Sequence, residues 1–337
     1  MAFNQSIQEN NLTLRGSLFG FGSIPGYREL PKTLKISLLR TTMIWNSLLP
    51  AGPEGEGLRA AISKYLDLLK EDMDAYSERD VVYFIATRTR VRIAKKPRYA
   101  IWSKNLVVPI QIGLEKKLRN IIIPHNFLSA HGLGSRPRIE NTELKITLRG
   151  SEGVSLTVPI HTILLELGIN LGIDSVITYV GKTENPGERV IDGNHRGLSD
   201  TLTASLEKQD DVFLFSNTFH ARHHAATADG GMSFVISNSM TDEIQVAPEA
   251  DLIEKLLICH FDPFTMKSQR KSDLTKLANS LAKIQKENQV VAVEMELEVD
   301  DESDYYRFGN KSIQPSGRHA FRCSLHEDGK LNYSTLQ

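Results

Sequence analysis

The order of helical and strand-like segments predicts a protein of the α+β class. From residue 153 onwards the pattern reads strand, helix, strand, helix, strand, strand and helix. A stretch rich in β-branched residues precedes this region, and a polar helix and an alternating strand follow it. Hydrophobic residues make up 40% of the 337 residues and charged residues 24%, which is typical of a folded globular chain and excludes wholesale disorder.

The expected elements follow from hydrophobic periodicity and from Gly, Pro and Asn punctuation. Before residue 150 we expect a short buried helix over Arg40–Leu49, an amphipathic helix over Gly57–Tyr76 and β-structure over Asp80–Ile123. After it we expect strands at Val154–Val158, Ser175–Val180, Val212–Ser216, Ser233–Ser237 and Val290–Asp300, and helices at His161–Leu171, Leu198–Lys208, Pro248–Phe261 and Ser272–Gln289. The strand from Val290 alternates apolar with acidic residues, which favours a half-buried edge strand with a solvated acidic face over a metal site at these carboxylates.

Length and composition predict three regions. A chain of 337 residues suffices for two or three domains, at roughly 100–200 residues each. The Gly- and Pro-rich segment Ala130–Asn141 is typical of a linker. We therefore expect an N-terminal α/β region (1–150), a central module (151–268) and a C-terminal helix with a β extension (269–337).

Charge and cysteine content limit the possible functions. The formal net charge of −1 gives no general attraction for phosphate, so such attraction must come from local patches. Two cysteines, Cys259 and Cys323, are too few for a disulfide framework or a four-thiolate zinc site. With neither a signal-like N-terminus nor a run of 18 apolar residues, a cytoplasmic location is expected.

A basic stripe is expected in the β-rich stretch. Arg88, Arg90 and Arg92 share one parity, so on a strand their guanidinium groups would line one face. Lys95 and Lys96 follow them directly. The stripe could bind a nucleic-acid backbone, or it could be the solvated face of an ordinary strand.

The most informative segment is a strand that ends in a glycine and a cation-rich turn. Residues 179–189 read Tyr-Val-Gly-Lys-Thr-Glu-Asn-Pro-Gly-Glu-Arg, which presents Lys182 and Arg189 as phosphate-binding cations. A nucleotide-binding loop would need a glycine five residues before Gly181, where Val176 stands, so that motif is excluded. On a later helix, residues 254–263 read Glu-Lys-Leu-Leu-Ile-Cys-His-Phe-Asp-Pro.

Together these two segments resemble the GIY-YIG nuclease superfamily over about 115 residues, 153–267. Its second strand carries Tyr-Ile/Val-Gly and then lysine, an arginine stands ten residues after the tyrosine, and a later helix carries Glu-x-x-Leu-Ile-x-x-x-x-Pro. Tyr179, Lys182, Arg189 and Glu254 match these positions. The resemblance implies a small antiparallel sheet flanked by helices, and a metal-dependent endonuclease acting on nucleic acid, with DNA the expected substrate.

The resemblance also implies a role for each residue. Glu254 would hold one divalent cation, Mg²⁺ or Mn²⁺, and Arg189 would neutralise the scissile phosphate. Tyr179 would orient or deprotonate the attacking water, and Lys182 would lower the pKa of that tyrosine or contact phosphate. His195 is a second candidate for the base, and otherwise contacts substrate or is structural.

Parts of the family pattern are missing. The first motif, Gly-Ile/Val-Tyr, normally lies shortly before the second tyrosine; Gly153-Val154-Ser155 could be a degenerate form of it, or His161 could fill the role of its tyrosine. The alternative to an enzyme is a catalytically degenerate module that binds nucleic acid or a protein partner. If the chain is an endonuclease, its flanking regions are expected to serve target recognition, partner binding or homo-oligomerisation. The segment with His220, His223 and His224 is expected as a solvated loop, with Arg222 available to nucleic acid, rather than as a zinc site.

Overall fold

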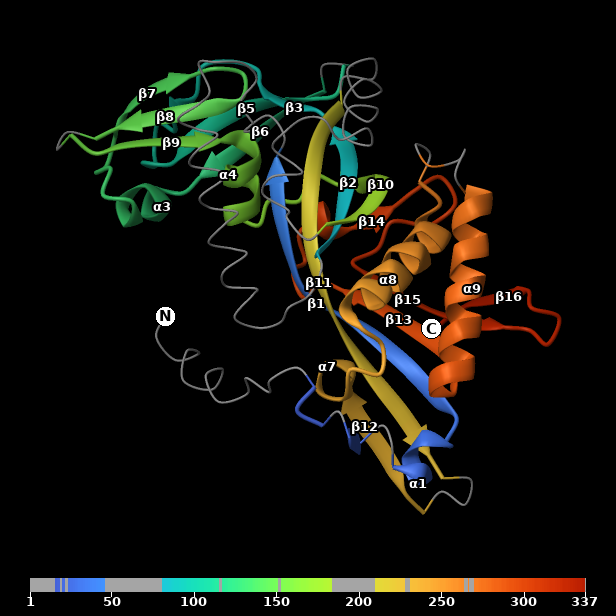
Figure 1. Ribbon diagram of the computed structural model, residues 1–337. Helices are drawn as coiled ribbons and strands as arrows, with labels where there is room; N and C mark the ends of the chain where they lie inside the picture. The colour runs from blue at the N-terminus through green and yellow to red at the C-terminus, as the bar shows by residue number, and fades with distance from the viewer. Residues whose placement is uncertain are drawn as a thin grey trace.

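The computed structural model describes residues 16–18, 20–21, 24–45, 81–114, 117–150, 153–183, 210–227, 231–263, 266 and 270–336. Among these, strands predominate over six α-helices, which confirms a mixed class of helices and strands (Figure 1). The strands form one large mixed sheet and two small antiparallel sheets. No helix in these ranges has the length and hydrophobicity needed to cross a membrane.

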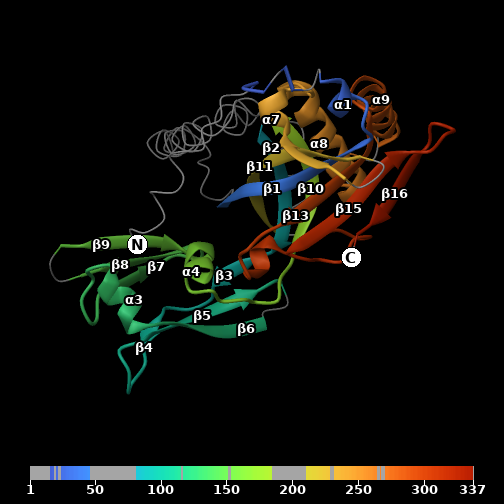
Figure 2. The same cartoon turned by 90° about the horizontal axis from the view of Figure 1, so that it is seen from below.

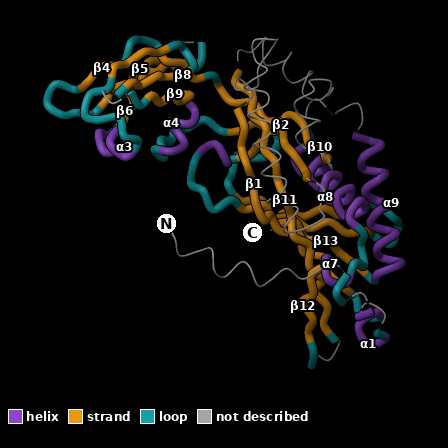
Figure 3. The backbone as a smooth tube through the Cα atoms, turned by 60° about the vertical axis from the view of Figure 1, so that its left-hand side comes forward, coloured by secondary structure: helices purple, strands orange, loops and turns teal. Residues whose placement is uncertain are grey.

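The large sheet has nine strands in the order β14-β10-β2-β11-β1-β13-β15-β16, with β12 also paired to β11. Most neighbours are antiparallel, but β1 pairs with β13, and β10 with β14, in parallel. β1 and β11 are long and lie side by side along the sheet (Figures 1 and 3). The strands are β1 (Lys32–Trp45), β2 (Val81–Thr89), β10 (Ser175–Thr183), β11 (Asp210–Ala226), β12 (Ser233–Ser237), β13 (Val290–Glu298), β14 (Phe308–Gly309), β15 (Arg318–Leu325) and β16 (Leu331–Thr335).

Two long helices, α8 (Val246–Phe261) and α9 (Arg270–Asn288), cover one face of this sheet. Apolar residues at helical spacing on α8, among them Leu252, Leu256 and Leu257, are buried. Each buried leucine contributes roughly 1.5–3 kcal/mol. Phe84 of β2 contacts Phe261 of α8 edge to face, with ring centroids 5.8 Å apart, which fixes the face of β2 that α8 covers. The short helices α1 (Pro25–Arg28) and α7 (Asn238–Thr241) lie with β12 at the end of the sheet away from the small sheets.

The two small sheets form an insertion, residues 90–174, between the neighbouring strands β2 and β10. One contains β3 (Val91–Ile93), β4 (Arg98–Tyr99), β5 (Leu106–Ile112) and β6 (Lys117–Ile123). The other contains β7 (Arg138–Asn141), β8 (Lys145–Arg149) and β9 (Ser155–Pro159), and the helices α3 (His125–Ala130) and α4 (Ile160–Glu166) accompany them. The insertion lies apart from α8 and α9 (Figure 2). The boundary expected near residue 150 falls between β8 and β9 of a single sheet.

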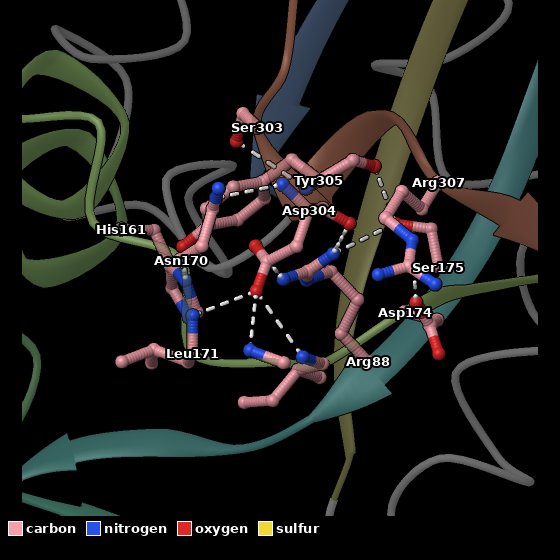
Figure 4. A network of polar contacts seen from close by, with 12 residues as sticks. Arg88, His161, Asn170, Leu171, Asp174, Ser175, Ser303, Asp304, Tyr305 and Arg307 are labelled. Carbon is pink, nitrogen blue, oxygen red and sulfur yellow. Dashed lines mark hydrogen bonds and ion pairs between the residues drawn. The ribbon is translucent and has the colours of Figure 1, made fainter. Parts of the chain in front are cut away.

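A buried polar network fastens this insertion to the large sheet (Figure 4). Asp304, in the 3₁₀ turn η5 (Asp304–Tyr306), accepts a 2.8 Å bond from Arg88 of β2 through Oδ1. Its Oδ2 accepts the backbone N–H groups of residues 171, 172 and 173 at 2.8, 2.8 and 3.1 Å. Beside it, His161 of α4 bridges Tyr305 and Asp211, at 2.5 and 2.9 Å. Buried charges are tolerated when they are paired and hydrogen-bonded, as these are.

Several predicted elements are confirmed and others are wrong. The strands β9, β10, β12 and β13 and the helices α4, α8 and α9 are present near their expected positions. The helix expected from Arg40 is wrong, because residues up to Trp45 belong to β1. The loop expected around His220 lies within β11, and β13 is an interior strand between β1 and β15 rather than an edge. The linker expected over 130–141 contains β7, and the helices expected over 57–76 and 198–208 lie outside the described residues.

Candidate functional site

Two tyrosines from neighbouring strands pack together at the centre of the candidate site. Gly181 of β10 lies opposite Tyr83 of β2 in the antiparallel register, and Tyr179 is two residues earlier on β10. The rings of Tyr83 and Tyr179 are stacked, with centroids 5.9 Å apart and planes 29° apart. Tyr83 is buried and Tyr179 is half-buried, so the Tyr179 phenol is the more accessible of the two.

Gly181 makes this packing possible. A Cβ atom at this position would lie 2.7 Å from Cε1 of Tyr179 and 2.7 Å from the hydroxyl oxygen of Tyr83. Both distances are well inside van der Waals contact, so any side chain at 181 would displace one of the rings. Glycine is therefore needed at position 181 because the rings of Tyr83 and Tyr179 approach the backbone closely there.

Tyr83 was missed by the sequence analysis. Residues 81–83 read Val-Val-Tyr, which matches the second and third positions of the Gly-Ile/Val-Tyr pattern, but they lie 96 residues before Tyr179 instead of shortly before it. The insertion accounts for the separation, since it leaves and re-enters the large sheet between two paired strands. A search for the pattern that allowed an inserted domain would have found it.

Ser155 and His161, which could take the place of the first-motif tyrosine, lie elsewhere in the structure. Ser155 begins β9, in a small sheet of the insertion. His161 is buried in the network that fastens the insertion, where burial is the main cause that lowers its pKa. Neither side chain is next to the tyrosine pair, and His161 is committed to Asp211 and Tyr305.

Lys182 projects to the other face of β10, towards α8. It is three residues from Tyr179, so on a strand the two side chains point to opposite faces. Its ammonium group is 3.1 Å from the Asp251 carboxylate on α8. Glu254 lies one helical turn beyond Asp251 and is largely buried, with its Oε2 2.8 Å from the ammonium of Lys255.

The structure thus groups the predicted residues in two sets. Tyr179 and Tyr83 lie on one face of the large sheet, while Lys182 points to the opposite face, where α8 with Glu254 packs. The outer edge of β10 separates them, and in the described part of the chain β14 pairs only with Ser175 and Val176 along that edge. Arg189 and His195 lie outside the described residues.

The basic stripe expected from Arg88, Arg90 and Arg92 is not formed. Arg88 belongs to β2 and is buried against Asp304, so it cannot contact nucleic acid in this conformation. Arg92 belongs to β3 of a small sheet and is 2.7 Å from Asp211, and Arg90 lies between the two strands, 3.9 Å from Glu143. Parity fails here because the chain passes from one sheet to another at residue 90. Lys95 and Lys96 are exposed between β3 and β4.

Within the described part of the chain, Glu254 is the predicted metal ligand, and its carboxylate is ion-paired with Lys255. No cluster of three or more His, Cys, Asp or Glu side chains able to hold a metal occurs among the described residues. Glu254 offers a single carboxylate, of which Lys255 contacts Oε2. Magnesium needs few protein ligands because it keeps most of its water, whereas zinc requires a fuller set of nitrogen or sulfur ligands. His220, His223 and His224 alternate along β11, so the middle one points to the opposite face from the other two.

Comparison with known proteins found no relative. No family model matches the chain, and neither a curated protein nor a solved structure is detectably similar to it.

Proposed function

We propose that this chain is a metal-dependent endonuclease that hydrolyses phosphodiester bonds in nucleic acid, with DNA the expected substrate, through a GIY-YIG-like module. The module consists of β10, β2, β11 and α8. The observation that carries the proposal is the stacking of Tyr83 and Tyr179 over Gly181 on two neighbouring antiparallel strands. The Lys182–Asp251 ion pair, which joins β10 to the helix of Glu254, supports it.

The outer edge of β10 is where a phosphodiester would be reached from both sets of residues. Tyr179 approaches this edge from one face of the sheet, and Lys182 approaches it from the other. Phosphodiester hydrolysis needs an oriented water, positive charge near the phosphate and help for the leaving oxygen. Tyr179 would hold the water through its hydroxyl, and Lys182 would supply positive charge once it leaves Asp251 for the phosphate.

Glu254 would be the protein ligand of the metal. A bound Mg²⁺ or Mn²⁺ ion would supply Lewis-acid stabilisation of charge on the phosphate and leaving oxygens. To bind such an ion, the Glu254 carboxylate must exchange the Lys255 ammonium for the cation. Lys255 is also 3.5 Å from Asp273 of α9, which gives the ammonium an alternative partner when it leaves Glu254. The resemblance adds Arg189 as the phosphate-neutralising residue and His195 as a second base.

The test is nicking of supercoiled plasmid in Mg²⁺ by the wild type, Glu254→Gln and Tyr179→Phe. Both variants should be slower by about 10²–10⁴-fold while keeping the wild-type melting temperature. Glu287→Gln is the matched control, because it makes the same change at an exposed carboxylate of α9. Wild-type rates in both site variants would reject the assigned residues.

A non-catalytic role has one specific observation in its favour. Glu254 is already neutralised by Lys255, as expected if this module binds nucleic acid or a protein partner without cleaving it. That function predicts oligonucleotide or partner binding with no nicking in Mg²⁺ or Mn²⁺ at any enzyme concentration. The same plasmid assay therefore decides between the two functions.

A further inference from the structure

The face of the large sheet that carries the tyrosine pair continues along β11 into a basic region. Alternate residues of a strand point to the same face. Ser216 of β11 pairs with Tyr83, and two-residue steps from Ser216 along β11 lead to His220 and Arg222. Arg222 therefore lies on the same face as Tyr83, six residues and about 20 Å further along the strand.

A cavity of about 320 Å³ lies on this face, where β11, β1, β13 and β15 run side by side. We call it the β1–β11 groove and define it by Lys35, Arg222, His224, Glu294, Glu296 and Arg318, which line it. Its volume is at the lower end of the range for small-ligand pockets, which leaves room for a phosphate group and its sugar. The helices α8 and α9 cover the opposite face of the sheet and do not line it.

One row of side chains across this groove carries an excess of positive charge. Lys35 pairs with Arg222 on one side and Glu294 on the other, and Glu294 pairs with Arg322. The row thus has three cations and one carboxylate, and Glu294 is shared by Lys35 at 3.5 Å and Arg322 at 2.9 Å. Like charges opposite each other on paired strands repel, as Lys35 and Arg222 do here.

Among the described residues, Arg222 is the groove cation that has no counter-ion. It forms no ion pair with any residue that the structure describes, and its Nε is buried with no hydrogen-bond partner there. The other carboxylate of the groove, Glu296, is already paired with Arg318 at 3.0 Å. Burial lowers the pKa of His224, so its ring is neutral near pH 7. The lining therefore has three cations against two carboxylates, and the excess is at Arg222.

We infer that the β1–β11 groove binds a phosphate group of the nucleic-acid strand whose phosphodiester lies at the tyrosine pair. That the phosphate belongs to nucleic acid rests on the proposed function, whereas that the groove binds phosphate rests on the residues of the groove. An anion between Arg222 and Lys35 removes their mutual repulsion, and Arg222 presents the planar guanidinium that suits phosphate. The groove is about 20 Å from Tyr83, so it would bind the nucleic-acid strand several nucleotides away from the cleaved bond. This second contact would set the direction in which the nucleic acid crosses β11.

The test is binding of a fluorescent oligonucleotide, single-stranded or duplex, measured by anisotropy in EDTA so that no cleavage occurs. Arg222→Gln and Lys35→Gln should each weaken binding about 10-fold. For a duplex, each should lower the slope of log Kd against log salt by about 0.9, the effect of one lost phosphate contact. Arg270→Gln, the same change at an exposed residue of α9 on the opposite side of the sheet, should leave both quantities unchanged. Unchanged melting temperatures establish that the variants are folded.

The outcomes separate this inference from the proposed function. Wild-type binding by both groove variants overturns the inference, even if the wild type nicks plasmid. Weakened binding by the groove variants supports it, even if the wild type never nicks plasmid and the proposed function fails. Inorganic phosphate that binds the wild type, is lost in Arg222→Gln and does not compete with the oligonucleotide assigns the groove to a free phosphate ligand and overturns the inference.

Discussion

The substitution Gly181→Ala tests the packing on which the candidate site depends. The added Cβ would lie 2.7 Å from Cε1 of Tyr179, and 2.7 and 2.8 Å from Oη and Cζ of Tyr83. Carbon atoms in contact are normally about 3.5–4.0 Å apart, so at least one ring must move by most of an ångström. The Tyr83 ring is buried and cannot move into solvent, so relief must come from Tyr179 or from the backbone of β10.

Overpacking of this kind costs about 1–3 kcal/mol of the free energy of unfolding. With a urea m value of about 3 kcal/mol per molar, at the upper end of the usual range because the chain is long, the midpoint should fall by roughly 0.3–1 M. Nicking should fall with it, because the Tyr179 hydroxyl leaves its position beside β10. The measurement is urea denaturation followed by fluorescence, with the plasmid assay on the same preparations.

The control for Gly181→Ala is Gly317→Ala, whose Cβ would meet no atom within 4 Å. It should leave the midpoint unchanged or raise it slightly, because alanine restricts the unfolded chain. Adding Tyr83→Leu to Gly181→Ala should recover part of the lost stability, since the smaller side chain vacates the space that the Cβ needs. Wild-type stability and nicking in Gly181→Ala would refute the close packing of the two phenols with Gly181.

Two further predictions concern buried polar groups. Asp304→Ala should lower the free energy of unfolding by about 3–5 kcal/mol, because it leaves the Arg88 guanidinium buried without its counter-ion; a loss below 1 kcal/mol in urea denaturation would contradict a dry, paired network. Burial lowers the pKa of His260 to about 3, below the value of about 6.5 in the unfolded chain. Between these values only the unfolded state binds the proton, so stability is complete above pH 6.5 and falls with decreasing pH towards 3. The wild type should therefore lose stability more steeply than His260→Gln over this interval in urea denaturations at fixed pH, and equal slopes would show that His260 does not contribute.

Local patterns were sufficient for elements whose burial is decided by their own sequence. The spacing of Ile253, Leu256 and Leu257 predicted α8, and the alternation from Val290 predicted β13. The segment from Arg40 was expected as a short buried helix, but its pairing with residues 213–218 of β11 makes it part of β1. Position in the sheet is a long-range property, as it also is for β13, which was expected at an edge.

The candidate site was predictable only in part, for the same reason. Tyr179, Lys182 and Glu254 stand in short motifs that can be read locally. Tyr83 becomes their neighbour only through a strand pairing across the insertion, which the Val-Tyr pair at residues 82–83 does not indicate unless a long insertion is assumed. Arg88 was interpreted as a surface cation because its partner Asp304 lies 216 residues later in the chain.

The insertion between β2 and β10 has a consequence for how the protein folds. Residues 90–174 form a loop of 85 residues that must be closed before the two strands can pair. Compared with a loop of about ten residues, its closure costs roughly 2 kcal/mol more in chain entropy. Prior folding of the two small sheets shortens the effective loop. The Asp304 carboxylate then bonds both to Arg88 of β2 and to the backbone N–H groups of residues 171–173, so it joins the end of the insertion to β2. The two tyrosines can therefore become neighbours only after residue 179 has been synthesised, so a shorter nascent chain cannot contain the assembled candidate site.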